Sequence, residues 1–365
     1  MRSARALSWL AAAVLTIAAA VVVVAALNAG HAAAPQNGRA STHAGQAATD
    51  SSAARGASTR SGRRAPALTG RRAPLPRPAA LKPFQKALIA SEGVWHAAGR
   101  RIRGIPAVYE TTLVPPGGTQ PAGIAWMDTH LLAARLYSGS GSPGGGPYKY
   151  TAPILPQAAK TLVAAFNGGF YMTAAEGGYY TEGKLVYPLR TGAASLVIYR
   201  GGWVNVGAWG SNVSMTRNVI AVRQNLVPLV AAGHPTALAY TSNWLLWGAT
   251  CGATNCASTT PGIEHQWRSG VGVTADGALV YVQGPGLDPL QVAQLLVRAG
   301  VIRGMQLDIN PYWPVLVTYR PATPLGEATP ANGSKLLKAS IQGPATFFTP
   351  SWARDFITMS ARVGP

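Results

Sequence analysis

The chain has 365 residues, with 31 Lys/Arg against 12 Asp/Glu and a formal net charge of +19. This balance is typical of nucleic-acid-binding proteins, but residues 1–104 hold 15 of the basic residues and two of the acids, so +13 of the charge lies there. The remainder has no stripe of interleaved arginine and aromatic residues, and we therefore set nucleic acid aside as a partner.

The first segment predicts export. Residues 7–27 form an uncharged apolar run of 21 residues behind Arg2 and Arg5. The apolar part of a signal peptide has about 7–15 residues, whereas a membrane span needs about 20. We expect residues 1–30 to be a retained signal-anchor, with a cleaved signal peptide as the alternative because small residues follow the run. Since the nearby positive charges precede the span, both alternatives place the rest of the chain outside the cytoplasm.

Residues 31–82 have the composition of a linker. They are rich in Ala, Ser, Gly, Pro and Arg, and such a segment buries too little apolar surface to offset its ordering entropy. We expect a disordered tether followed by one folded domain at 83–365, either membrane-anchored and extracytoplasmic or secreted. The arginine pairs at 63–64 and 71–72 are either solvated linker charge or contacts to anionic envelope polymers or lipid.

Most elements expected in residues 83–365 are strands. An apolar run at 124–139 is bounded by Gly and Pro, and the turns at 201–202 and 276–277 indicate hairpins. One clear helix lies between Asp288, which is suited to cap its start, and Gly300, which follows its end. We predict an α+β fold with a mostly antiparallel sheet and few packed helices, in a single domain.

Cys251 and Cys256 are the only cysteines of the chain. An even pair in an exported protein predicts a disulfide that closes a small loop. The alternative is half of a metal site, but further ligands are missing and Cys-x4-Cys is not a usual zinc spacing. We expect no metal and no cofactor.

Six segments occur together in a specific order. They are AAFNGGFY (164–171), EGKLVYPL (182–189), SLVIYRGGWVNVGAWG (195–210), RQNLVPLVAAG (223–233), WRSGVGVTADGALVYV (267–282) and MQLDIN (305–310). In this series the chain resembles the phosphodiester glycosidase family from about residue 124 to residue 313. One member of that family hydrolyses N-acetylglucosamine from a phosphodiester-linked mannose. The resemblance implies a hydrolase of glycosyl phosphodiester bonds, here in sugar-phosphate polymers or glycolipids of the cell envelope.

One motif departs from the family pattern. The family has Asp-Gly-Gly-Gly-Ser at the end of the last strand, whereas here Asp308 is followed by Ile309, Asn310 and Pro311. Glycines permit positive φ and let a ligand approach the backbone amides, and proline has no N–H to offer. We therefore expect a divergent branch, with either a different substrate or no activity.

Acids are scarce, which narrows the catalytic candidates. Asp308 ends a buried strand, where an unpaired charge is costly, and Glu182 follows the Asn-Gly-Gly segment closely. The resemblance makes both candidates for action on the anomeric centre and on water. The structural alternatives are a cap of the following loop for Asp308 and a surface acid in a hairpin turn for Glu182. Further candidates, each more often explained as a surface or loop residue, are Glu176, His234 and His265.

The candidate substrate-binding groups are an amide-rich bend and two cations. Asn167, Gly168 and Gly169 form either a plain turn or a site-lining turn whose amides hold a phosphate oxygen and a sugar hydroxyl. A guanidinium grips phosphate in a bidentate manner, which makes Arg268 and Arg190 candidates, with a strand-edge charge as the alternative for Arg268. The aromatics near these positions serve sugar stacking or core packing; they are Phe170, Tyr171, Tyr179, Tyr180, Tyr312 and Trp313.

The sequence leaves three functional hypotheses. The first is an exported or membrane-anchored hydrolase of glycosyl phosphodiesters, acting on an anionic glycan or sugar phosphate, in which 167–169, Arg268 and Asp308 share one concavity. The second is a non-catalytic envelope module that binds anionic glycans, and the third is a tether in envelope assembly. The usual motifs of serine hydrolases, zinc proteases and phosphate-loop enzymes do not occur.

Overall fold

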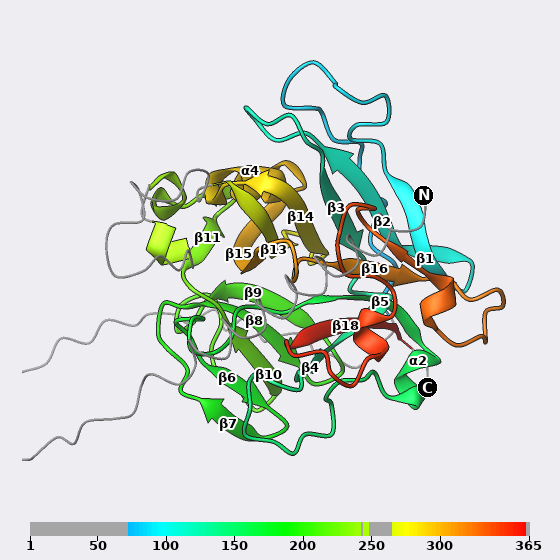
Figure 1. The fold of residues 1–365 in the computed structure, drawn as a ribbon, viewed down its shortest axis with the longest axis vertical. Helices are drawn as coiled ribbons and strands as arrows, with labels where there is room; N and C mark the ends of the chain where they lie inside the picture. The colour runs from blue at the N-terminus through cyan, green and yellow to red at the C-terminus, as the bar shows by residue number, and fades with distance from the viewer. Residues whose placement is uncertain (1–71, 242–243, 248–264, 363–365) are drawn as a thin grey trace, which may run out of the picture. The chain divides into compact units, whose positions relative to one another are not determined.

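The structure, a computed structural model, describes residues 72–241, 244–247 and 265–362 (Figure 1). The chain divides into two units, Met1–Ala65 and Pro66–Pro365, and the described residues all belong to the second. The expected signal segment at 1–30, most of the linker, and both cysteines, Cys251 and Cys256, lie outside the described residues. Within the described ranges, no helix has the length and apolar character required to cross a membrane.

Strands are the main type of regular secondary structure in the described chain. Their bounds are β1 His96–Ile102, β2 Ile105–Leu113, β3 Ala122–Met127, β4 Leu132–Tyr137, β5 Leu162–Asn167, β6 Tyr179–Thr181, β7 Lys184–Tyr187, β8 Ala194–Tyr199, β9 Val204–Ala208, β10 Val219–Gln224, β11 Pro228–Ala231, β12 His234–Pro235, β13 Gln266–Thr274, β14 Leu279–Leu287, β15 Val301–Ile309, β16 Leu316–Tyr319, β17 Gly333–Lys335 and β18 Phe356–Ala361. The helices are α2 Pro156–Ala159 and α4 Pro289–Arg298, with 3-10 turns η1 Ala237–Tyr240, η2 Trp244–Trp247, η3 Pro330–Asn332 and η4 Thr346–Phe348.

These strands form three sheets in which neighbouring strands are antiparallel. The first sheet has the order β1-β2-β3-β14-β13-β15-β11-β12, the second β7-β6-β10-β8-β9 and the third β17-β16-β5-β18-β4. The predicted antiparallel architecture with few helices is therefore confirmed. Because α4 is the one α-helix of the described residues that exceeds a single turn, this part of the chain is mostly β rather than α+β.

Helix α4 begins at the residue that the sequence indicated. Asp288 Oδ1 accepts a hydrogen bond from Gln291 N at 2.6 Å, and Gln291 Oε1 accepts one from Asp288 N at 3.0 Å, which is a complete capping box. Gly300 follows the helix with a φ of 87°. The helix covers one face of β13, β14 and β15 (Figure 1), and its buried side chains include Val292 and Leu296.

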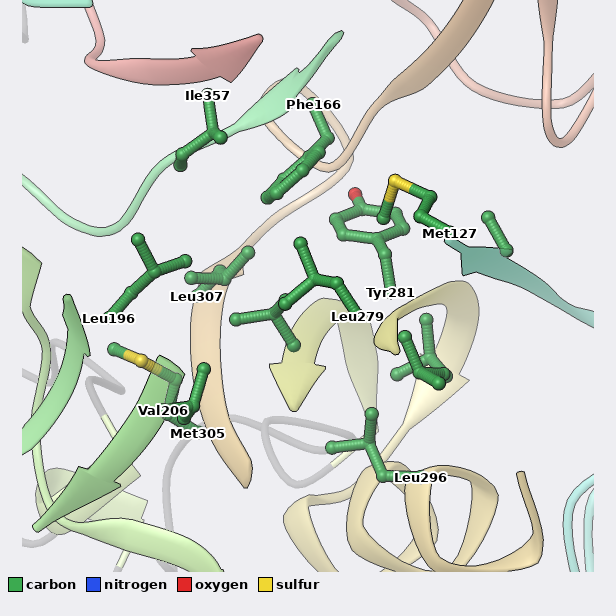
Figure 2. Close-up of a cluster of buried hydrophobic side chains, with 14 of the residues drawn as sticks. Met127, Phe166, Leu196, Val206, Leu279, Tyr281, Leu296, Met305, Leu307 and Ile357 are labelled. Carbon is green, nitrogen blue, oxygen red and sulfur yellow. The ribbon is translucent and has the colours of Figure 1, made fainter. Parts of the chain in front are cut away.

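One hydrophobic core joins the three sheets and α4 (Figure 2). Its buried side chains from the first sheet and α4 include Met127, Leu279, Tyr281, Met305, Leu307 and Leu296. Those from the second and third sheets include Leu196, Val206, Phe166 and Ile357. β5, β13 and β15 all contribute to this core, and they carry the polar residues Asn167, Ser269 and Asp308 at its border.

Residues 72–82, which the sequence assigned to the linker, lie against the folded unit. Leu75 N donates to Asp128 Oδ2 at 2.9 Å, and Leu81 N donates to Gly93 O at 2.9 Å. The guanidinium of Arg72 lies 4.6 Å from the ring centroid of Trp203. Because these contacts satisfy backbone groups, the ordered chain extends before the expected boundary at residue 83.

Candidate active site

Asn167 ends β5, and its side-chain amide joins this strand to β13, β14 and the residue before β16. Its Oδ1 accepts from Tyr281 Oη at 2.6 Å and from Val315 N at 3.2 Å, while its Nδ2 donates to Ser269 Oγ at 3.0 Å and to Gly168 O at 2.8 Å. The residue is 1% exposed. Every polar atom of this amide is thus engaged within the protein, which makes it a buried positioning group.

The two glycines after Asn167 permit close packing of charged side chains. A Cβ at Gly168 would lie 2.1 Å from Asp355 Oδ2, and one at Gly169 would lie 2.5 Å from Asn225 Oδ1 and 2.8 Å from Arg223 Nη2. Gly168 N already donates to Asp355 O at 2.8 Å. Both positions therefore require glycine, because any larger side chain would overlap these neighbouring side chains.

Arg223 and Asp355 form a buried bidentate ion pair beside the glycines. Arg223 Nε lies 2.8 Å from Asp355 Oδ2 and Arg223 Nη2 lies 3.2 Å from Asp355 Oδ1, with both side chains fully buried. Arg223 Nη2 also donates to Phe170 O. These bonds compensate the cost of burying the two charges and hold the Gly168–Phe170 backbone in place.

Asp308, at the end of β15, lies against a second buried arginine. Its Oδ2 is 3.2 Å from Arg354 Nη1, and its Oδ1 accepts from Ile309 N at 2.8 Å. Arg354 Nη1 also donates to Gly169 O at 3.2 Å. The contact of Oδ2 with the guanidinium is an ion pair without hydrogen-bond geometry, so this oxygen has no hydrogen bond from the described residues. A buried carboxylate oxygen with unused acceptor capacity is suited to take a proton.

Burial raises the pKa of Asp308 to about 7, compared with an ordinary value of 3.8. The guanidinium of Arg354, the N–H of Ile309 and the more distant Arg223 oppose this shift, whereas the charge of Asp355 adds to it. Desolvation is therefore the dominant cause. A carboxyl with a pKa near 7 is able to accept and release a proton at neutral pH.

Aromatic rings surround Arg354 and connect it to the surface. Its guanidinium lies 3.8 Å from the ring centroid of Tyr171 and 4.6 Å from that of Trp313. Tyr171 is 37% exposed and Tyr312 is 57% exposed. Asn310, one of the residues in place of the family's glycines, has a φ of 78° and accepts from Tyr312 N at 2.8 Å. We call Tyr171, Tyr312 and Trp313 the aromatic rim.

The structure brings together the bend at 167–169 and the carboxyl at 308. Ser269 Oγ receives a hydrogen bond from Asn167 Nδ2 at 3.0 Å and another from Asp308 N at 3.2 Å. Arg354 supplies a second connection, since it contacts both Gly169 O and Asp308 Oδ2. These two parts of the expected constellation therefore belong to one cluster.

Arg268 precedes Ser269 on β13, but its side chain takes another direction. Its Nε donates to Leu287 O at 2.7 Å and its Nη1 donates to Gln306 Oε1 at 2.9 Å. The side chain is fully buried, and this burial lowers its pKa to about 10. Phosphate binding by Arg268 stays a prediction, and the guanidinium that contacts Asp308 is that of Arg354.

The other site residues predicted from the sequence lie in turns and at exposed positions. Glu182 occupies the β6–β7 turn with a φ of 51°, and its two carboxylate oxygens accept from Lys149 N and Tyr150 N, each at 2.9 Å. Arg190 is exposed and paired with the exposed Glu176. His234 and His265 are exposed as well. None of the side-chain hydrogen bonds or ion pairs found for these described residues reaches Asp308, so their catalytic or binding roles stay predictions.

Sequence reasoning missed Arg223, Arg354 and Asp355. One signal was available: Asp355 begins an apolar run directly after Arg354, in a chain with only 12 acids, much as Asp308 ends one. An acid next to a buried strand needs a partner, and here the partners are arginines.

Among the described residues, no group of three or more His, Cys, Asp or Glu is placed to hold a metal ion.

Comparison with known proteins gives only distant similarities. No protein-family model matches the sequence, and no curated protein matches it. The chain is similar to the catalytic domain of zebrafish N-acetylglucosamine-1-phosphodiester alpha-N-acetylglucosaminidase, auto-inhibited by its pro-peptide, with 18% identity, a TM-score of 0.44, and coverage of 73% of this chain and 88% of that chain.

Two further solved structures are similar at 11% identity and a TM-score of 0.37. One is a hypothetical protein from Synechocystis, matched over 73% of this chain and 64% of that chain. The other is a putative exported protein from Burkholderia pseudomallei, matched over 67% of this chain and 75% of that chain. At TM-scores below 0.5, these similarities assign neither a family nor an activity.

Proposed function

We propose that the chain is an exported or membrane-anchored hydrolase of glycosyl phosphodiester bonds in envelope sugar-phosphate polymers or glycolipids. The observation that carries the proposal is the pairing of Asp308, a carboxyl whose pKa is raised to about 7, with Arg354 beneath an aromatic rim. A proton-transfer group, a cation for phosphate and rings for a sugar face are the components that this reaction needs. The resemblance of the six ordered sequence segments supports the same reaction class.

In the proposed reaction Asp308 acts as the general base. Its ionised Oδ2 takes a proton from water while the water oxygen forms a bond to the anomeric carbon. The bond between that carbon and the phosphate oxygen breaks, and the phosphate monoester leaves with the bonding electron pair. Because the second pKa of such a monoester is about 6, its departure needs little help from an acid.

Arg354 takes the role of phosphate ligand in this proposal. Its guanidinium already lies between the buried carboxyl and the aromatic rim, so a phosphate held there would present the anomeric carbon near Asp308. Asp308 is only 1% exposed. Substrate entry therefore requires a local movement that exposes this carboxyl.

The test is the Asp308→Asn variant with a chromogenic sugar-1-phosphodiester. We expect kcat/KM to fall by at least about 10²-fold, because general-base catalysis contributes about 10²–10⁴-fold. The Tm at pH 5 should stay within about 3 °C of wild type, since asparagine has the shape of the protonated acid. Asp276→Asn, at an exposed hairpin turn, is the matched control and should keep full activity. Undiminished turnover by Asp308→Asn would remove this carboxyl from the mechanism.

The alternative is a non-catalytic module that binds anionic glycans, and the low exposure of the cluster favours it. Asp308 and Arg354 are 1% and 6% exposed, and Asn167 has no unused polar atom. A buried network of this kind also serves as pure structure. A pull-down and a turnover assay on the same phosphodiester-linked glycan separate the two functions, because the enzyme releases product from that glycan and the module only binds it.

A further inference from the structure

Two neighbouring cavities lie apart from the cluster around Asp308. Their volumes are about 400 and 490 Å³, and both are lined by Arg135 and Tyr150, so this pair separates one hollow from the next. We call the two hollows together the arginine groove. Its polar and aromatic lining includes Arg135, Lys149, Tyr150, Tyr180, Glu182, Arg200 and Arg217.

Backbone hydrogen bonds bring the three arginines of the groove together. Arg200 N donates to Asn218 O at 2.6 Å, which holds the β8–β9 turn beside the loop that carries Arg217. Ala134 N donates to Gly202 O at 2.8 Å, which joins β4 and its Arg135 to the same turn. Arg135 therefore lies within β4 while Arg200 and Arg217 lie in tight turns, and the fold fixes the spacing of their backbone positions.

The groove carries an excess of positive charge. Glu182 is the one acid in its lining, and both of its carboxylate oxygens accept from the backbone N–H groups of Lys149 and Tyr150. Arg200 and Arg217 are exposed, and the ion pairs found among the described residues do not involve either of them. A concave surface lined by one sign of charge concentrates ligands of the opposite sign.

Aromatic rings accompany the charge. The guanidinium of Arg135 lies 4.2 Å from the ring centroid of Tyr150, on the ridge between the hollows, and Tyr180 lines the first hollow. Tyrosine rings present flat apolar faces to sugars, while arginine forms bidentate contacts with phosphate, sulfate or carboxylate groups. Two adjacent hollows with this lining suit a ligand that repeats a ring and a charge.

We propose that the arginine groove binds a linear anionic glycan, with one charged unit in each hollow. The groove shares no lining residue with the cluster formed by Asp308, Arg354, the aromatic rim and residues 167–169. It is a second binding position, and its occupation does not depend on hydrolysis at Asp308. A glycan without phosphodiester bonds therefore tests it independently of the proposed enzyme activity.

Residue-resolved arginine modification is the direct test. The full chain is treated with phenylglyoxal, with and without a hyaluronate decasaccharide, and each arginine is followed by mass spectrometry. The glycan should slow modification of Arg200 and Arg217 at least fivefold and leave the exposed Arg320 unchanged. Because each arginine is measured separately, the basic N-terminal residues do not obscure the result. Absent protection, or equal protection of Arg320, overturns the proposal.

Affinity measurements on matched variants give a second test. Arg200→Ala/Arg217→Ala should weaken decasaccharide binding at least tenfold, because each lost charge-assisted contact is worth about tenfold. Arg320→Ala/Lys338→Ala removes the same charge outside the groove and should stay within twofold of wild type. An equal loss in both variants means general charge attraction and overturns the site.

Comparison of ligands tests the chemical class. Tyr180→Ala should weaken binding of the decasaccharide and leave binding of linear polyphosphate unchanged, since only the sugar uses the ring. Equal losses for both probes, or stronger protection of Arg200 by phosphatidylglycerol vesicles than by the glycan, contradict a glycan site.

Discussion

At Gly168 the backbone passes so close to a buried carboxylate that hydrogen is the only side chain that fits. The neighbouring oxygen belongs to Asp355, whose partner Arg223 also restricts Gly169. Neither glycine adopts the left-handed backbone region, so glycine is required here for steric reasons and not for its backbone conformation. The Asn-Gly-Gly sequence thus encodes a packing constraint around an ion pair.

Gly168→Ala should destabilise the protein by about 3 kcal/mol. The added methyl group overlaps Asp355 Oδ2, and relief of that overlap separates the buried pair from Arg223. Chemical unfolding of the variant and the wild type measures the difference. Gly343→Ala is the matched control, because a Cβ there meets nothing within 4 Å, and its stability should not fall. A Gly168→Ala variant as stable as this control would contradict the packing explanation.

Single residues show where sequence reasoning succeeds and where it stops. The first functional hypothesis expected residues 167–169, Arg268 and Asp308 to share one concavity, and the structure joins 167–169 and Asp308 in a buried cluster. The direction of the Arg268 side chain was not predictable, because register shifts on both sides of β13 next to this residue alter the simple alternation of faces. Arg354 was missed because only the tertiary fold places it beside Asp308.

At the level of elements, local signals predicted local structure correctly. The turn at 201–202 joins β8 to β9 and the turn at 276–277 joins β13 to β14, as the glycine-containing dipeptides indicated. The pairing of the central strands of each sheet was not predictable from such local signals. β3 pairs with β14, and β5 lies between β16 and β18, so these pairings depend on segments far apart in the sequence.

The capping box of α4 provides a prediction at this level. Asp288→Ala removes the acceptor for Gln291 N and should reduce the free energy of unfolding by about 1 kcal/mol. Asp288→Asn retains a side-chain oxygen and should lose less than half of that amount. Urea unfolding of the two variants checks the order, and equal losses would contradict a capping role.

At the level of the whole molecule, the buried carboxyl of Asp308 and the half-buried carboxyl of Glu110 couple stability to pH. Burial raises the pKa of Asp308 and that of Glu110 on β2, each to about 7, from ordinary values of 3.8 and 4.5. Both groups therefore bind protons more tightly in the folded chain than in the unfolded chain. Their contribution to stability is complete below about pH 4 and is lost as the pH rises through about 7.

Asp308→Asn/Glu110→Gln should remove this part of the pH dependence. The Tm of the wild type relative to that of the variant should fall between pH 5 and pH 7.5, because only the wild type gives up the two protons. Differential scanning calorimetry at several pH values measures both curves under the same conditions. Other titrating groups are common to the two proteins and cancel in the difference. Parallel curves would show that these carboxyls are not perturbed.

The position of β18 has a consequence for how the protein reaches its native state. β18 is the last strand described, it lies between β5 and β4, and it follows directly after Arg354 and Asp355. Asp355 meets Arg223 across 132 residues of sequence. A chain emerging from the ribosome consequently has to be made through residue 355 before both arginines have their acidic partners. During synthesis the cluster therefore assembles only after residue 355 has been made, and the edges of β4 and β5 that pair with β18 stay unpaired until that strand follows.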